Sequence, residues 1–175
     1  MALNTSYAEQ SAAFAGMLAD LTEKEASPYV QGEASAEIAF GAGVVEGTAA
    51  TEAGGFNGAI LPVDANSVFA GVLLHAHDLD PRTELGTTGV KPGAAISVLK
   101  EGRVWVYTED TIAKGATLFL RHTDNGAGKV KGQFRSDADT NKAIEVPVVA
   151  VDGRTGAGLI LVDVDVLAGK MIAQL

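Results

Sequence analysis

The chain has 175 residues, of which 47% are hydrophobic, and it carries a formal net charge of −9 at pH 7. That length suits one domain, and the apolar content is too high for a globally disordered chain. With 13 basic against 22 acidic residues, the chain lacks the clustered Lys and Arg that bind phosphate backbones, so we expect no nucleic-acid partner. Because cysteine is absent, disulfides, thiol catalysis and Cys-ligated metals are excluded.

No targeting signal or membrane span is expected in this sequence. Its first ten residues, MALNTSYAEQ, lack the basic start and the apolar run of a secretory signal. No stretch approaches the roughly 20 apolar residues that span a bilayer. We therefore expect no membrane partner, and the lack of cysteine is consistent with synthesis inside a cell.

Residues 6–21 leave two alternatives open. Their apolar side chains fall near helical spacing and the segment is rich in Ala, which favours a short helix. Gly16 weakens such a helix by about 1 kcal/mol relative to Ala. The alternative is an extended arm that becomes ordered only against a partner. In either case, we expect an N-terminal arm or short helix over residues 1–27.

Residues 22–28 read TEKEASP and are typical of a linker, since Pro28 disfavours helix directly before it. From there to residue 175 the pattern changes to short segments rich in β-branched residues, several of them alternating between apolar and polar. We therefore expect a second unit, residues 28–175, that is mainly β. The expected strands are 36–41, 56–63, 67–76, 94–99, 103–108, 117–122, 130–135, 144–151 and 158–166.

Turn residues separate these strands. Gly-containing turns are expected at residues 100–103 (KEGR), 124–128 (DNGAG) and 152–158 (DGRTGAG). The pairs Asn125-Gly126 and Asp152-Gly153 are favoured where a hairpin needs positive φ. Strands at this spacing, joined by hairpin turns, predict a compact antiparallel β-barrel or sandwich.

Three glycine or acidic motifs resemble ligand sites but lack required positions. Residues 41–47 (GAGVVEG) are one residue off the dinucleotide fingerprint, and no helix pattern follows. Residues 125–132 (NGAGKVKG) place Val130 where a P-loop needs Ser or Thr. Residues 137–142 (DADTNK) begin like a calcium loop, but Lys142 replaces the turn glycine and Val148 the bidentate Glu. We interpret the last segment as a solvated polar loop.

His75 and His77 are the sharpest local feature. On a strand the two side chains share a face, and Asp78 or Asp80 could add an oxygen ligand. Two imidazoles are half a zinc site at best, and the third histidine, His122, is distant along the chain. Two surface histidines near a strand end are the commoner outcome. We therefore predict no metal site, although an enzyme with a metal at this pair stays a rival hypothesis.

Other catalytic patterns are also missing. Asp163 and Asp165 alternate with Val162, Val164 and Val166, which indicates a solvated strand face with the valines toward the core. Paired carboxylates for acid–base work need two different environments, and no G-x-S-x-G elbow is present. The sequence thus predicts no catalytic, cofactor-binding or metal residues, and no enzyme.

Residues 104–107 form an apolar run within an expected strand. Because successive strand residues point to opposite faces, Val104 and Val106 should enter the core while Trp105 and Tyr107 face the other way. Those two aromatics then need a second cover. It could be the N-terminal segment, another strand layer or another subunit, since large aromatics with one polar tip are enriched at interfaces.

The chain resembles a known family through a series of segments in a fixed order. AFAGMLADL comes first, then EASAEIAFGAGVVEG, FAGVLLHA, VKPGAAISVLKEGRVWVYTEDTIAKGATLFLRH, GQFRSDADTNKAIEVPVVAVD and a closing GLILVDVDV. Together they resemble the structural cement (capsid decoration) proteins of tailed bacteriophages. The resemblance runs from about Phe14 to Val166, and its most specific part lies between Pro92 and Leu120. AGMLADL follows a longer, Ala-rich start, which leaves the role of the first residues open.

The resemblance implies a non-enzymatic virion protein. Such a protein would sit on the outer surface of the capsid, after assembly in the host cytoplasm, and tie neighbouring major capsid subunits together. Its implied partners are the phage major capsid protein and itself, as a dimer or trimer. The family carries no catalytic residues that could be transferred to this chain. The alternative hypothesis from another class is a carbohydrate-binding or host-binding β module on the virion surface.

Overall fold

A computed structural model describes residues 13–19, 24–33, 36–47, 57–75, 89–126 and 128–166. The fold is mainly β, as the sequence predicts. In the described residues no helix is long and apolar enough to cross a membrane. The strands are β1 (Glu25–Gln31), β2 (Ile38–Ala39), β3 (Gly43–Glu46), β4 (Gly58–Ile60), β5 (Phe69–Leu73), β6 (Gly89–Val90), β7 (Ala95–Thr108), β8 (Thr117–Arg121), β9 (Phe134–Arg135), β10 (Ala143–Ala150) and β11 (Gly158–Asp165).

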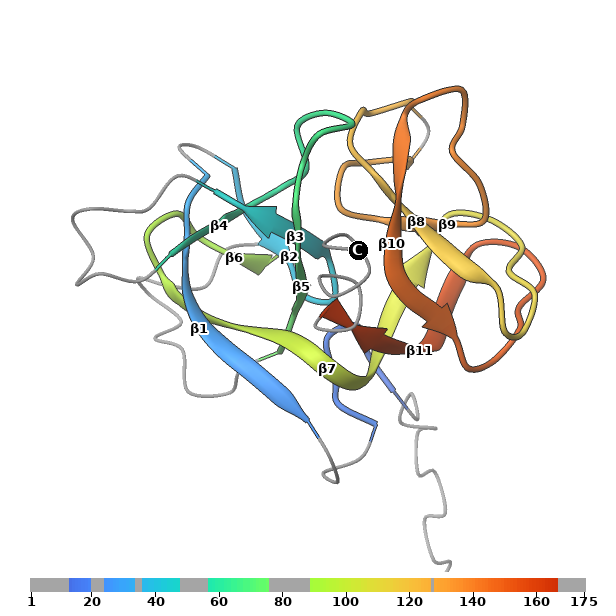
Figure 1. The fold of residues 1–175 in the computed structure, drawn as a ribbon, viewed down its shortest axis with the longest axis horizontal. Helices are drawn as coiled ribbons and strands as arrows, with labels where there is room; N and C mark the ends of the chain where they lie inside the picture. The colour runs from blue at the N-terminus through green and yellow to red at the C-terminus, as the bar shows by residue number, and fades with distance from the viewer. Residues whose placement is uncertain are drawn as a thin grey trace, which may run out of the picture.

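The main sheet closes on itself twice around β7. Its strand order is β1-β4-β3-β5-β7-β11-β10-β8-β9, with additional pairings β1–β7 and β7–β9. The first closure makes a ring of β7, β1, β4, β3 and β5, called here the N-terminal ring. The second makes the C-terminal ring of β7, β11, β10, β8 and β9. Figure 1 shows β7 running from the β1 side of the molecule to the β11 side. Most pairings are antiparallel, but β1–β4 and β7–β9 are parallel.

The molecule has two hydrophobic cores, one inside the N-terminal ring and a larger one that fills the C-terminal ring. The larger core also takes in Val45 of β3 and Phe69 and Val72 of β5, and β7 contributes to both cores. Ile96 and Val98 belong to the core of the N-terminal ring, whereas Leu99, Val104 and Val106 belong to that of the C-terminal ring. The two cores are therefore covered by opposite faces of one strand at Val98 and Leu99, because adjacent strand residues point to opposite sides. The predicted burial of Val104 and Val106 is confirmed, with both side chains fully buried.

The turn expected at residues 100–103 is wrong. The two strands expected on either side of it form the single strand β7, which has 14 residues. Composition favours a hairpin turn at this point, but long-range pairing overrides it. One half of β7 pairs with β1, and the other half pairs with β11 through Gly102 itself. Gly102 has a φ of 122°, a backbone conformation that its lack of a side chain permits.

The linker expected at residues 22–28 is also wrong in part, because β1 begins at Glu25. Its first residues pair with β7, with Ala26 opposite Leu99 and Pro28 opposite Ser97. Only the end of β1, at Val30, also pairs with β4, so Pro28 lies where a strand has one neighbour. A proline, which has no N–H to donate, is tolerated at such a position. The division into residues 1–27 and 28–175 stays a prediction.

The turns expected after residues 123 and 151 are present. Residues 124–126 and 128 lie between the antiparallel strands β8 and β9, and Gly126 has a φ of 64°. The segment 152–157 joins the antiparallel strands β10 and β11. There the positive φ falls on Gly156 and Gly158 rather than on Gly153.

Candidate functional site

An outward apolar face lies on strands β7 and β11 of the C-terminal ring. Trp105 is opposite Leu161, and Tyr107 is opposite Leu159. Residues directly opposite in an antiparallel pair project to the same side of the sheet, so these four side chains form one surface, called here the outer face. Three of them are half-buried, and Tyr107 is 47% exposed. Trp105 and Tyr107 thus point away from the core, as the sequence predicts.

The N-terminal segment lies along the free edge of β7 at the same level. Gly16 N–H donates to the Trp105 carbonyl (2.8 Å), and Trp105 N–H donates to the Met17 carbonyl (3.0 Å). Ala19 N–H donates to the carbonyl of Arg103, and Leu18 bridges Val104. Of the two alternatives left open above, residues 13–19 are non-helical and run beside a strand. This segment satisfies the backbone N–H and C=O groups of Trp105.

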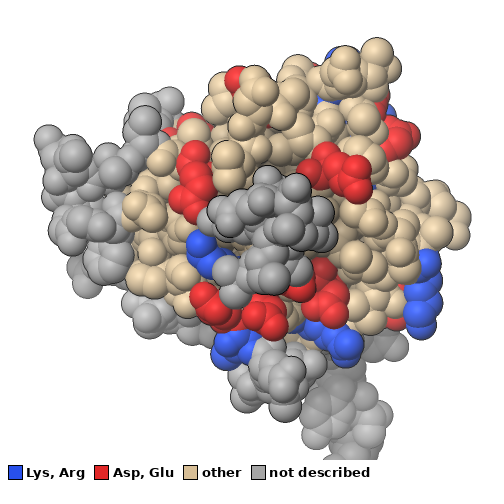
Figure 2. Space-filling model, in the orientation of Figure 1, with Lys and Arg blue, Asp and Glu red and all other residues tan. Residues whose placement is uncertain are grey.

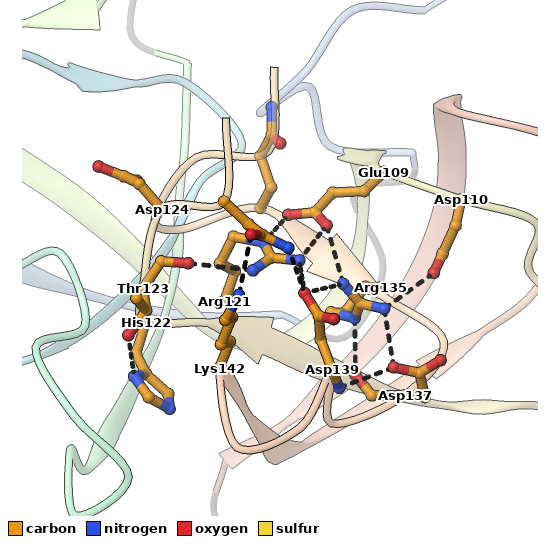
Figure 3. Close-up of polar contacts among 12 residues, drawn as sticks. Glu109, Asp110, Arg121, His122, Thr123, Asp124, Arg135, Asp137, Asp139 and Lys142 are labelled. Carbon is orange, nitrogen blue, oxygen red and sulfur yellow. Dashed lines mark hydrogen bonds and ion pairs between the residues drawn. The ribbon is translucent and has the colours of Figure 1, made fainter. Parts of the chain in front are cut away.

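A cluster of buried charges lies at one end of the C-terminal ring (Figure 3). The Arg121 side chain is fully buried and that of Glu109 is 1% exposed. Arg121 Nε donates to Glu109 Oε1, and Arg121 Nη2 lies 2.8 Å from Glu109 Oε2. Arg135 Nη1 reaches the same Glu109 oxygen at 3.2 Å. Glu109 is therefore shared by two guanidinium groups, which compensates its removal from water.

Two loop carboxylates complete this charge cluster. Asp139 Oδ2 accepts hydrogen bonds from Arg121 Nη2 (2.6 Å) and lies 3.0 Å from Arg135 Nη1. Asp137 Oδ1 accepts from Arg135 Nη2 (2.7 Å), and Asp110 lies 3.6 Å from the same nitrogen. Charge-assisted pairs of this kind are stronger than neutral hydrogen bonds. The cluster ties the loop before β10 to strands β8 and β9.

The backbone of this loop is strained. Asp139, Thr140 and Asn141 have φ values of 42°, 54° and 63°, so three successive non-glycine residues are left-handed. Such a conformation costs of order 1–3 kcal/mol per residue and persists only where the surroundings impose it. The ion pairs to Asp137 and Asp139 supply that constraint. The interpretation of residues 137–142 as a merely solvated loop is therefore incomplete.

The electrostatics of the cluster favour the ionised form of its two loop carboxylates, Asp137 and Asp139. The hydrogen bond from Arg121 lowers the pKa of Asp139, and the backbone N–H of Asp139 lowers the pKa of Asp137. The hydrogen bond to Glu109 raises the pKa of Arg121, against the opposing effect of burial. Carboxylates locked in this way are poor proton donors at neutral pH, so the geometry suits a structural role rather than acid–base chemistry.

Little in the sequence predicts this cluster. Arg121 and Arg135 each end a short apolar strand, and Glu109 follows another, which places charges at strand ends. Only the folded ring brings the three together. The available signal was the position of Arg121 directly after the buried run at Leu118 and Leu120.

The remaining candidate residues lie apart from one another. His75 packs against the rings of Phe14 (4.8 Å between centroids) and Phe40 (4.4 Å), while His77 lies outside the described residues. His122 points away from the two arginines in Figure 3, and its Nδ1 is 2.9 Å from the Thr123 hydroxyl. Within the described ranges, no three His, Asp or Glu side chains are placed to hold a metal.

The glycine motif and the paired aspartates have structural roles. Gly43 begins β3, and a Cβ there would collide with Leu120 of the C-terminal core. Asp163 and Asp165 are exposed while Val162, Val164 and Val166 are buried, which confirms the predicted alternation.

The comparisons with known proteins identify the family. The family described as "Structural cement protein (E217 gp24/Pam3 gp6)" matches residues 3–165. The chain belongs to this structural cement protein family. The predicted family is thereby confirmed, and it is a family of phage structural proteins. A search of curated proteins finds no match.

A solved structure shares the fold of this cement family member. A chain from "The capsid of Myoviridae Phage XM1" is similar with a TM-score of 0.63 and 18% sequence identity. The similarity covers 94% of this chain and 98% of that chain. At this identity the likeness establishes a common fold over nearly the whole length of both chains.

Proposed function

We propose that the protein binds the outside of a phage capsid and cements neighbouring major capsid subunits, which stabilises the head. The observation that carries this proposal is the family match over residues 3–165. The fold shared with a chain of the XM1 capsid supports it. The protein then acts on the virion surface, after assembly in the host cytoplasm, and it acts by binding rather than by catalysis.

The physics of a repeating shell suits a small rigid module. Each contact with one capsid subunit can be weak, because linked contacts on neighbouring subunits raise the effective concentration of the second site. A protein that binds only the assembled shell stabilises that state by mass action. The two closed rings and the buried charge cluster provide the rigidity that transmits such contacts.

The direct test uses shells from a phage that lacks the protein. Purified protein is added to these shells, and binding and resistance to heat are measured together. We expect saturable binding and a higher temperature of shell disruption. Binding without a gain in heat resistance would instead favour the virion-surface carbohydrate-binding or host-binding module, which a glycan array would then examine.

We infer that the outer face contributes to shell binding or to self-association as a dimer or trimer. Large aromatics such as Trp105 often dominate interface energies. Trp105→Ala should weaken shell binding or shift the oligomeric mass measured by light scattering. Phe119→Ala, a half-buried aromatic on β8, is the matched control. Loss of monomer stability alone for Trp105→Ala would assign the residue to internal packing.

We also infer that residues 1–27 take part in docking. Residues 16–19 hydrogen-bond to β7 at Arg103 and Trp105, so this part of the segment lies beside the strand that carries the outer face. Limited proteolysis of free and shell-bound protein measures its protection. We expect cleavage within residues 1–27 to slow on binding, and equal cleavage in both states would remove this part of the proposal.

A further inference from the structure

A groove of about 530 Å³ lies where the two rings meet. Part of its lining comes from the connection between β1 and β3 and from Leu61 after β4, on the side of the N-terminal ring; from the connection come Glu33, Ala36, Glu37 and residues 39–42. The rest comes from Tyr107 of β7 and from Asp124 and residues 130–133, which lie between β8 and β9 of the C-terminal ring. Gly43 N–H donates to the Gly132 carbonyl (2.9 Å) beside it, so the two parts are joined directly. A groove of this size accommodates one or two large side chains.

The groove exposes apolar surface that no described side chain fills. Tyr107 and Val130 are each 47% exposed, and both line it together with the partly buried Phe40 and Leu61. Exposed apolar residues that converge on one concavity, rather than being scattered singly, mark an interaction site. Tyr107 also belongs to the outer face, so the groove is continuous with the surface proposed above to contact partners.

The charged residues of the groove are mainly acidic. Glu33, Glu37 and Asp124 line it, against the single cation Lys131. Backbone amides hold two of these carboxylates in place. Leu61 N–H donates to Glu33 Oε1, and Lys131 N–H donates to Asp124 Oδ1, both at 2.8 Å.

These two carboxylates are available to a cationic partner. Among the described residues, neither Glu33 nor Asp124 forms an ion pair. Asp124 also points away from Arg121 in Figure 3. Acidic side chains cover more of the face in Figure 2 than basic ones do, in keeping with the net charge of −9. An occupant that brings positive charge would be complementary to this groove.

We propose that this groove binds an extended segment of the capsid shell protein, in which an apolar side chain is flanked by Lys or Arg. This inference rests on the function proposed above and names the surface that performs it. The apolar side chain would pack between Tyr107 and Val130. The cationic groups would lie beside Glu33 and Asp124, with partly desolvated ion pairs that fix the register of the segment.

The first test compares two exposed valines. Val130 lies in the groove, whereas Val63 is 59% exposed and outside it. Val130→Asp places a charged, polar side chain where an apolar contact with the capsid segment is proposed. Binding to shells that lack the protein should weaken at least about tenfold for Val130→Asp, the size expected of an interface centre. Val63→Asp should bind like the unaltered protein.

The second test removes charge without removing hydrogen-bond acceptors. Glu33→Gln with Asp124→Asn keeps an oxygen for each backbone amide. A matched double variant, Glu145→Gln with Asp152→Asn, changes the same charge at exposed positions outside the groove. Shell binding of the groove variant should be weaker at low salt and less sensitive to added salt, because the screened attraction is gone. The matched variant should keep the salt dependence of the unaltered protein.

The outcomes separate the two proposals. If the unaltered protein does not bind shells, the cement function and the groove are both overturned. If it binds, but Val130→Asp binds as well as Val63→Asp and the groove variant keeps its salt dependence, the groove assignment is overturned while the cement function stands. Circular dichroism and thermal melting establish that each variant is folded. If Val130→Asp fails to fold, the isosteric charge variant alone decides.

Discussion

The two rings share a strand but are stabilised differently. The core of the C-terminal ring is larger and is built mainly from Val, Leu and Ile, together with the fully buried Phe134. The N-terminal ring has short strands and a smaller core that includes Ala59, Ala70 and Ala94. Its buried polar contacts are neutral donors on a few acceptors, such as Tyr29 donating to Glu46 (2.8 Å) and the buried Gln31 donating to the Ala36 carbonyl (2.7 Å), whereas the C-terminal ring has the whole charge cluster. The comparison teaches that the buried ion pairs and the larger core are concentrated in one ring, while the groove lies at its junction with the other.

The largest expected effect comes from breaking the charge cluster of the C-terminal ring. Glu109→Gln leaves two buried guanidinium groups with too little negative charge, which typically costs about 3–5 kcal/mol. Urea unfolding measures the loss. Asp163→Asn is the control, because Asp163 pairs with Arg103 at 3.7 Å on the surface and such pairs contribute about 1 kcal/mol or less. Equal losses for the two variants would contradict the importance given to the cluster.

A matched pair of leucines compares the two cores. Leu120 belongs to the C-terminal core and Leu73 to the N-terminal core, and both are fully buried. Each substitution by Ala should cost about 2–5 kcal/mol through lost burial and the cavity left behind. Because β7 lines both cores, each variant should lower the same single unfolding transition, measured by fluorescence and circular dichroism. Two separate transitions would show that the rings unfold independently.

Two glycines test how closely β5 packs against β7 in the N-terminal ring. Gly71 in β5 has a φ of 144°, and a Cβ there would collide with the Leu99 carbonyl and lie 2.7 Å from Val98 Cγ1. Gly115 has a φ of 78°, with open space around it. Gly115→Ala should cost about 1 kcal/mol from backbone strain alone. Gly71→Ala should cost about 1–3 kcal/mol more, since β5 must move away from β7. Thermal melting would contradict this contrast if both variants lost the same stability.

Acid should weaken the C-terminal ring through its loop carboxylates. The pKa values of Asp137 and Asp139 lie below their ordinary value of 3.8. A lowered pKa in the folded state contributes stability that is present above the unfolded-state pKa and is lost as pH falls through the folded value. The free energy of unfolding should therefore decline below about pH 4, as urea titrations at several pH values would show. The double variant Asp137→Asn with Asp139→Asn should make this decline shallower. If the decline of stability with falling pH were unchanged, these two carboxylates would not be its cause.

Local patterns predicted the parts of the fold that depend on one strand at a time. The alternation of Val162 and Val164 with Asp163 correctly places the valines in the core, because a strand with one solvated face needs no other information. The burial of Val104 and Val106 follows from the same reasoning. The short strand β6 was missed, since two residues are too few for any periodicity to appear.

Features that depend on distant segments could not be predicted. The sequence around Gly102 favours a turn, and only pairing with β1 and β11 extends the strand through it. The carboxylate partners of Arg121 and Arg135 come from two separate segments, residues 109–110 and 137–139, so no local spacing reveals that Glu109 is shared by both arginines. The groove likewise combines Glu33 and residues 36–42 with Tyr107 and residues 130–133, and exists only after the two rings have closed.

Strand β7 makes the two halves of the molecule inseparable. A cut or an insertion within its 14 residues would open both rings at once. The same change in the connection between β10 and β11 would disturb a single surface loop. Neither half can therefore be excised as a smaller working fragment. Peptides or cargo should accordingly be fused to this scaffold at residues 152–157, a turn that belongs to the C-terminal ring alone.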